Sequence, residues 1–142
     1  SDGGNLGLYL AAHHPERIAS LIAMGANYEA DGLTDDCYEE TLGRYEELLA
    51  LPDSDPEKTQ LLCVHNLMLE ELDLSAADLS RIQAPTLLLA GEYDLIRDDQ
   101  TEAMHRLIPG SQKYIVPGGS HSFFVDDPKV LEQLAKKFYS NL

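Results

Sequence analysis

The chain has 142 residues, of which 44% are hydrophobic and 25% charged, and its formal net charge is −15. This composition is typical of one globular domain and excludes a disordered tail or a coiled coil. Its acidity disfavours nucleic acid and anionic membrane surfaces as partners, and no apolar run approaches the roughly 20 residues of a membrane span. We see no secretory signal and expect a cytoplasmic location. Cys37 and Cys63 lack metal-ligand spacing, so we expect two reduced thiols on helices.

The first residues predict a helix followed by a buried strand. In the segment 5–14, Leu6 and Leu10 share one helical face, and Pro15 ends the helix. Glycine weakens a helix by about 1 kcal/mol relative to alanine. We therefore expect this helix to lie very close to another element at its glycines, which are Gly3, Gly4 and Gly7. Residues 17–24 form a nearly continuous apolar run, which is typical of a strand buried on both faces of a parallel sheet.

The segment 28–81 has a different character. Between Glu29 and Asp78 the sequence has 15 acidic residues against two basic ones, so most of the net charge lies here. Two stretches separated by prolines keep a helical spacing. The residues with this spacing are Tyr38, Leu42, Tyr45, Leu48 and Leu49, then Leu61, Leu62, His65, Met68, Leu69 and Leu72. Ser75 with Asp78 approximates the capping box of a third, short helix. We interpret the segment as a helical insertion with a solvated acidic face.

After this insertion, strands and helices alternate. Residues 86–90 and 113–116 predict two further buried strands, each followed by a polar loop. A helix from Asp98 to Leu107 separates them, and Pro128 lies in the first turn of a last helix. Such alternation with short connections predicts an α/β fold with a parallel sheet and right-handed connections. The expected division is an α/β core made of residues 1–27 and 82–142, with a helical acidic insertion at residues 28–81.

Three polar side chains are predicted to meet beyond the carboxyl ends of the strands, where open α/β sheets bind ligands. Asp94 follows the second strand, His121 follows the third, and Ser1 precedes the first helix. The order Ser, Asp, His along the chain is that of the α/β-hydrolase triad, whose nucleophile lies on a G-x-S-x-G turn between a strand and a helix. Residues 1–3, Ser-Asp-Gly, supply the S-x-G half of that motif.

The wider pattern resembles the α/β-hydrolase superfamily. Ser-Asp-Gly-Gly-Asn at 1–5 is similar to its nucleophile elbow, Ala-Gly-Glu-Tyr-Asp at 90–94 to its acid loop, and Pro-Gly-Gly-Ser-His at 117–121 to its histidine loop. The segment 28–81 matches the position of its helical cap. The elbow and Gly-Ala-Asn at 25–27 are similar to the valacyclovir-hydrolase and C–C-hydrolase-like branches. The resemblance implies the carboxyl-terminal part of that fold, with three parallel strands, helices and a cap insertion.

The resemblance also implies a serine hydrolase that acts on a small ester, amide or related carbonyl substrate through an acyl-enzyme. Ser1 would be the nucleophile, His121 the base that takes its proton, and Asp94 the group that holds the imidazole tautomer. The backbone N–H of Asp2 would be one oxyanion donor, and its carboxylate either binds a substrate ammonium or only braces the elbow. The alternative is that neither residue is catalytic, so that Asp94 is only a turn residue and His121 only a loop histidine. No metal or organic cofactor is implied.

Other residues remain open as alternatives. Asp98, Asp99 or Asp126 would replace the predicted acid, although each lies where a helix cap is expected. Ser120 and Ser122 flank the predicted catalytic histidine, and we expect them to be hydrogen-bonding loop residues. The other histidines are expected to be structural or solvated residues on helices: His13, His14, His65 and His105.

If the chain begins at Ser1, the family's earlier strands and its second oxyanion donor are absent, and strand 17–24 has a bare edge. Exposed edges promote association, which predicts a homo-oligomer paired through the 17–24 strands. Three explanations of the missing strands stay open. The chain is a fragment made by proteolysis or by a split reading frame, it is the ordered part of a longer protein, or it is an enzyme whose nucleophile Ser1 uses its own α-amine as the base. Besides the serine hydrolase, the sequence leaves a second function open: a non-catalytic remnant of a hydrolase fold that acts as an oligomeric binding or assembly module.

Overall fold

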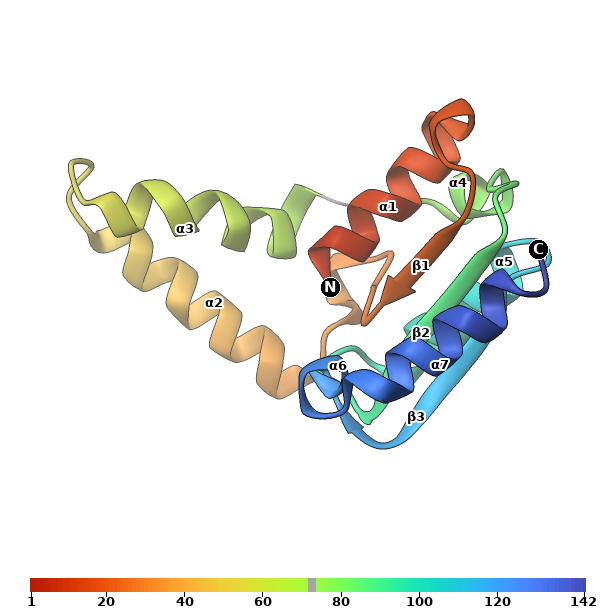
Figure 1. The fold of residues 1–142 in the computed structure, drawn as a ribbon. Helices are drawn as coiled ribbons and strands as arrows, with labels where there is room; N and C mark the ends of the chain where they lie inside the picture. The colour runs from red at the N-terminus through yellow and green to blue at the C-terminus, as the bar shows by residue number, and fades with distance from the viewer. Residues whose placement is uncertain (72–73) are drawn as a thin grey trace.

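A three-stranded parallel sheet forms the centre of the chain (Figure 1). The strands lie side by side in the order β1 Leu21–Met24, β2 Thr86–Tyr93 and β3 Gln112–Ser120. The computed structural model describes residues 1–71 and 74–142. The predicted α/β class and the parallel sheet are confirmed. Leu72, which the helical spacing included, lies outside the described residues.

The helical elements largely follow the predicted ranges, and the strands differ from them at their ends. The helices are α1 Asp2–His13, η1 Pro15–Arg17, η2 Ala30–Gly32, α2 Asp35–Ala50, α3 Pro56–Asn66, η3 Leu67–Glu71, α4 Ala76–Ser80, α5 Asp98–Leu107, α6 Phe123–Asp126 and α7 Pro128–Tyr139. β1 is shorter than the predicted strand 17–24, because a 3₁₀ turn ends at Arg17. β2 and β3 are longer, because their pairing continues into segments that we expected to be loops.

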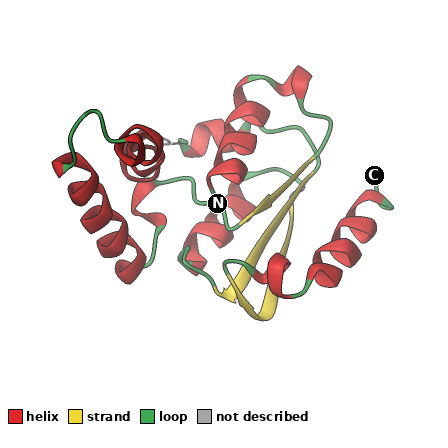
Figure 2. Cartoon of the chain, turned by 60° about the vertical axis from the view of Figure 1, so that its left-hand side comes forward, coloured by secondary structure: helices red, strands yellow, loops and turns green. Residues whose placement is uncertain are grey.

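Helices cover both faces of the middle strand, and Figure 2 shows the strands between them. On one face, Leu88 packs with Leu8 of α1 and Ile108 after α5. On the other face, Leu87 and Leu89 pack in the cluster of α6 and α7, whose buried members include Phe123 and Phe138. Successive side chains of a strand point to opposite faces, so a strand covered on both sides needs a continuous apolar sequence.

Helix α1 lies very close to β1 at two of its three glycines. A Cβ atom at Gly4 would lie 3.2 Å from the Cβ of Ala26, and one at Gly7 would lie 2.8 Å from Cδ1 of Leu21. Around Gly3 there is open space instead. The expected close approach is therefore confirmed at Gly4 and Gly7, where an added methyl group would press on Ala26 and on the Leu21 side chain.

Helices α2 and α3 pack against each other and extend away from the sheet as a hairpin, which we call the α2–α3 hairpin (residues 35–66; Figure 1). In α2 only Cys37, Thr41 and Leu48 are buried, and α3 buries none of its residues. The short helix α4 has the predicted capping box, and its Leu79 is fully buried in the cluster beneath α1. Among the described residues, no helix has both the length and the apolar character needed to cross a membrane.

Candidate active site

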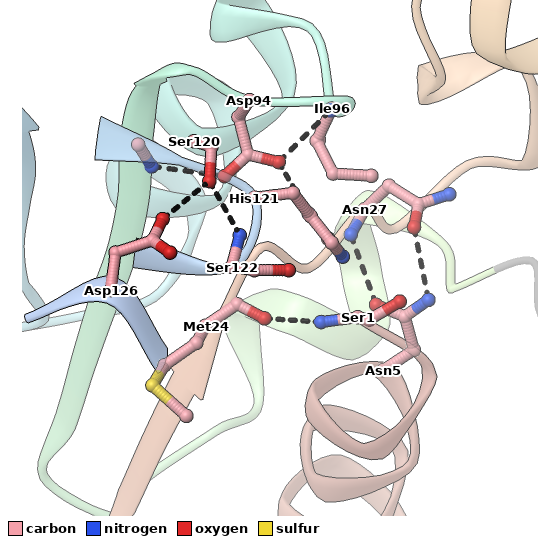
Figure 3. Close-up of polar contacts among 11 residues, drawn as sticks. Ser1, Asn5, Met24, Asn27, Asp94, Ile96, Ser120, His121, Ser122 and Asp126 are labelled. Carbon is pink, nitrogen blue, oxygen red and sulfur yellow. Dashed lines mark hydrogen bonds and ion pairs between the residues drawn. The ribbon is translucent and has the colours of Figure 1, made fainter. Parts of the chain in front are cut away.

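A carboxylate and an imidazole meet beyond the carboxyl ends of β2 and β3. Oδ1 of Asp94 lies 2.6 Å from Nδ1 of His121, and the Asp94 side chain is only 1% exposed whereas that of His121 is 22% exposed (Figure 3). A buried carboxylate at this distance makes Nδ1 the protonated nitrogen, so Nε2 is left as an acceptor. The pair therefore has the arrangement that a general base requires.

The Asp94 carboxylate is held by backbone donors as well as by the imidazole. Its Oδ2 accepts a hydrogen bond from the N–H of Gly91 at 2.9 Å, and its Oδ1 accepts one from the N–H of Ile96 at 3.1 Å. Burial acts to raise the pKa of Asp94, but the hydrogen bonds from His121, Gly91 and Ile96 favour the charged form more strongly, and the pKa is lowered. Asp94 is thus an anion fixed in place.

An irregularity in the sheet brings His121 to this position. β2 and β3 pair regularly as far as Gly91 and Val116, and the next pair is Tyr93 with Ser120, so β3 contains extra residues at the bulge. Gly118, within these residues, has φ +69. A bulge of this kind bends a strand and redirects its following side chain. Here it places His121 beside the turn that carries Asp94.

Ser1 lies at the start of α1, next to the end of β1. Its amino nitrogen donates a hydrogen bond to the carbonyl of Met24. Ser1 and His121 line one pocket of about 280 Å³, together with Gly3, Gly4, Ile22, Met24 and Phe124. In Figure 3 the imidazole lies between Asp94 and Ser1. Within the described residues no hydrogen bond joins Ser1 to His121, although both residues line this pocket.

A pair of buried asparagines fixes the start of α1 to the segment after β1. Nδ2 of Asn5 donates to Oδ1 of Asn27, and the N–H of Asn27 donates to Oδ1 of Asn5, both at 3.0 Å. The Asn27 amide also donates to the carbonyl of Glu29 at 2.7 Å. This network, which sequence reasoning did not assign, holds the first turn of α1 in place. The signal was the Asn that ends each of two motifs, Ser-Asp-Gly-Gly-Asn and Gly-Ala-Asn.

The alternative acids make other contacts. Asp99 forms an ion pair with Arg97, at 3.1 Å, in the first turn of α5. Asp126 accepts a hydrogen bond from the Ser120 hydroxyl at 3.4 Å, and Ser120 accepts one from the backbone N–H of Ser122. Ser120 is thus a hydrogen-bonding residue as expected, but it lies at the end of β3 and not in a loop. Asp98 is the first residue of α5 rather than its cap, which is Arg97. Asp94 is the carboxylate that contacts the histidine.

The other histidines have local partners. The ring of His13 lies 3.7 Å from Asp78 and packs beside Tyr9, and His65 and His105 contact the carbonyl of Leu61 and the hydroxyl of Ser111, each at 2.9 Å. His14 lies just beyond α1 rather than on it. Within the described residues, no group of three or more His, Cys, Asp or Glu side chains is placed to hold a metal ion.

The segment leading into the hairpin is attached beside Asp94. Leu33 forms an antiparallel bridge with Ile96, whose N–H donates to the Asp94 carboxylate. Gln100, only 2% exposed, accepts hydrogen bonds from the N–H groups of Tyr28 and Glu29 and donates to the Glu29 carboxylate at 3.0 Å. No sequence pattern pointed to Gln100. Both cysteines are free thiols, and burial raises the pKa of the Cys37 thiol.

Comparison with known sequences yields short matches. No family model matches the chain. Two Mycobacterium tuberculosis proteins, from two strains and both named "Putative phosphoribosyl transferase", are 38% identical to it over 65 residues. That match covers 45% of this chain but only 14% of those proteins, so it does not carry the activity in their name to this chain.

Comparison with solved structures gives matches over nearly the whole chain. A meta-cleavage product hydrolase from Pseudomonas fluorescens has a TM-score of 0.72 at 16% identity, covering 97% of this chain and 61% of that one. A serine hydrolase involved in carbazole degradation has a TM-score of 0.70 at 23% identity, with coverages of 100% and 62%. An α/β hydrolase from a deep-sea metagenome has a TM-score of 0.74 at 18% identity, with coverages of 99% and 62%.

These structures are similar to the chain over all three strands and the surrounding helices, and the chain spans about three fifths of their length. Identities below 25% carry the fold and not the substrate or the reaction. The parallel sheet, its covering helices and the polar groups beyond its strand ends agree with that likeness. The chain thus has a fold similar to about three fifths of an α/β-hydrolase structure.

Proposed function

We propose that the chain carries the catalytic residues of a serine hydrolase, with Ser1 as nucleophile, His121 as general base and Asp94 as the anion that orients it. The observation that carries this proposal is the 2.6 Å contact between Asp94 and His121, beside a pocket that Ser1 also lines. A serine hydroxyl is a weak nucleophile and needs a base oriented by a third group. The neighbouring hydrolase structures support the same reaction class.

The substrate is a small ester, amide or related carbonyl compound. Oγ of Ser1 attacks the carbonyl carbon while Nε2 of His121 takes the hydroxyl proton. The tetrahedral intermediate then expels an alcohol or amine, which receives that proton from His121, and an acyl-enzyme remains. A water molecule gives a proton to His121 and attacks the acyl group. The new tetrahedral intermediate then expels Oγ of Ser1, which takes this proton back from His121, and the acid is released. Asp94 stays ionised and stabilises the imidazolium.

Asp2 has two roles in the proposal. It is the first residue of α1, where backbone N–H groups have no partner within the helix, so its N–H serves as one oxyanion donor. Its carboxylate, beside the nucleophile, favours a substrate that carries an ammonium group. The acidic segment 28–81, as the proposed cap, favours the same charge.

A second candidate function rests on the free edge of the sheet at β1. In the described chain β1 pairs only with β2, which leaves its other edge free. On the neighbouring helix α1, Leu6, Tyr9 and Leu10 are between 41% and 47% exposed. Free edges and apolar patches favour association. In this candidate the chain is a non-catalytic assembly module, a homo-oligomer paired through β1.

Labelling with a fluorophosphonate tests the enzyme proposal. We expect one adduct in the intact mass, located on Ser1 by peptide mapping, lost in Ser1→Ala and retained in the matched variant Ser120→Ala. An adduct that persists in Ser1→Ala would contradict the assignment of the nucleophile. A folded but unlabelled chain that sediments as an oligomer would favour the assembly module, whereas an unlabelled monomer would remove both candidates.

A further inference from the structure

Gly25 occupies an unusual position at the end of β1. Its φ is +53, in the left-handed region that glycine adopts without strain. Its N–H donates to the carbonyl of Leu89 at 2.8 Å, which continues the pairing of β1 with β2 by one residue. The residue therefore lies at the strand end next to the acid and histidine turns, and its backbone is attached to the middle strand.

The space in front of Gly25 is filled by the catalytic pair. A Cβ atom on Gly25 would lie 2.6 Å from Cε1 and 2.7 Å from Nδ1 of His121, and 3.5 Å from Oδ1 of Asp94. The first two distances are shorter than any normal van der Waals contact between such atoms. An alanine at this position would thus overlap the edge of the imidazole that faces Asp94.

The backbone around Gly25 has little freedom to retreat from such a clash. On one side its own N–H is bonded to Leu89, and on the other the N–H of Asn27 donates to Asn5 at 3.0 Å. Ala26 between them is 3% exposed and packs close to Gly4. The imidazole, by contrast, is a side chain at the mouth of a pocket and is 22% exposed. The ring would therefore move, and not the strand.

We propose that Gly25 is a positioning residue: its missing side chain admits the His121 ring to the place where Nδ1 meets Asp94. The geometric basis of this inference is the set of contacts above, and its catalytic meaning rests on the proposed hydrolase function. A one-ångström displacement of a catalytic group costs about 10²-fold in rate, so a methyl group here is sufficient to disable the site without touching the substrate.

The test compares Gly25→Ala with Gly110→Ala in the full chain. Gly110 is the matched control, because it has φ +69 and open space around an added Cβ, so it bears the same backbone strain away from the site. The first readout is the NMR signal of the His121 Nδ1 proton bonded to Asp94. We expect this signal to be lost in Gly25→Ala and in Asp94→Asn, and to persist in Gly110→Ala. Persistence in Gly25→Ala would overturn the proposal.

The second readout is hydrolysis of a p-nitrophenyl ester. We expect kcat of Gly25→Ala to fall about 10²-fold with KM nearly unchanged, and Gly110→Ala to retain kcat. If the proton signal responds as expected but the unmodified chain does not hydrolyse the ester, the positioning role of Gly25 stands and the hydrolase proposal is wrong. If hydrolysis occurs and Gly25→Ala retains kcat, the positioning falls alone.

A measurement on the unmodified chain covers the case in which Gly25→Ala does not fold. The closeness of the glycine backbone to the ring predicts a strong nuclear Overhauser effect between the Hα protons of Gly25 and Hε1 of His121. Its absence in the folded, unmodified chain would overturn the proposal without any variant.

Discussion

The sheet core and the α2–α3 hairpin are held together by different means. In β2 every residue from Thr86 to Gly91 is buried, and its two faces contribute to two separate apolar clusters. In the hairpin, α3 buries no residue and α2 buries three. Both regions are regular in secondary structure. The hairpin therefore depends on local terms such as spacing, caps and ion pairs, whereas the core depends on burial.

The two regions also treat charge differently. In the hairpin, Lys58 pairs with Asp53, and Arg44 pairs with Glu47 and Glu57, all near the surface. In the core, Asp94 is buried and held by two backbone N–H groups and an imidazole. Exposed pairs contribute little to stability, whereas a buried anion requires its donors. The candidate chemistry therefore lies where the fold, and not the solvent, holds the charge in place.

The largest expected effect comes from removing the charge in the core. We expect Asp94→Asn to lower kcat for ester hydrolysis by about 10⁴-fold, because the imidazole loses the group that fixes its tautomer. The control is Asp98→Asn, an exposed carboxylate in the same region of the chain, which should retain kcat. Equal kcat in Asp94→Asn and the unmodified chain would show that this anion has no catalytic role.

Truncation of one leucine in each region compares their packing directly. Leu88 is 1% exposed in the core, and Leu42 is 37% exposed in the hairpin. We expect Leu88→Ala to lower the free energy of unfolding by about 2–5 kcal/mol and Leu42→Ala by about 1 kcal/mol or less. Urea unfolding measures both. Equal losses would mean that the hairpin is packed as tightly in solution as the core.

The junction of the two regions is tested at Gln100. Gln100→Ala leaves the half-buried N–H groups of Tyr28 and Glu29 without their acceptor, which we expect to cost about 1 kcal/mol of unfolding free energy. Gln60→Ala, an exposed glutamine on α3, is the control and should be nearly neutral. A neutral Gln100→Ala would indicate that the hairpin is not anchored through this network.

The smallest effect concerns the acid side of the stability curve. The folded pKa of Asp94 is lowered below the unfolded value of about 3.9, so between these two values the unfolded chain binds more protons. Its contribution is complete above about pH 4 and is lost as the pH falls through the folded pKa. The melting temperature of the unmodified chain should therefore fall as the pH falls through this window, and in Asp94→Asn it should depend less on pH there.

The matching carboxylate of the hairpin should behave differently. A hydrogen bond from Lys58 lowers the pKa of Asp53, but this side chain is 97% exposed. We therefore expect Asp53→Asn to change the melting temperature below about pH 4 only at low salt, because ions screen an exposed pair. An Asp53→Asn effect at high salt as large as that of Asp94→Asn would remove the distinction between the two regions.

Most of the helices and strands, and their order, follow from local patterns in the amino-acid sequence. The apolar run 86–90 predicts a strand covered on both faces, and the helical spacing after Asp98 and Pro128 predicts α5 and α7, because these signals are local. Three glycines in the first helix predicted its close approach to another element, which holds at Gly4 and Gly7 but not at Gly3. The placement of Asp94 and His121 at neighbouring strand ends also follows from the order of the motifs, since parallel strands end at one edge.

The geometry of the candidate site depends instead on contacts between segments that are far apart in the chain. The bulge that turns His121 toward Asp94 depends on the register of β2 with β3. Gly25 and Gln100 act on residues far away in the chain, and no periodicity in one segment reports a contact with another. Strand register and side-chain contact are properties of the packed core, which forms from all segments together, and so they were not readable from any stretch of the sequence alone.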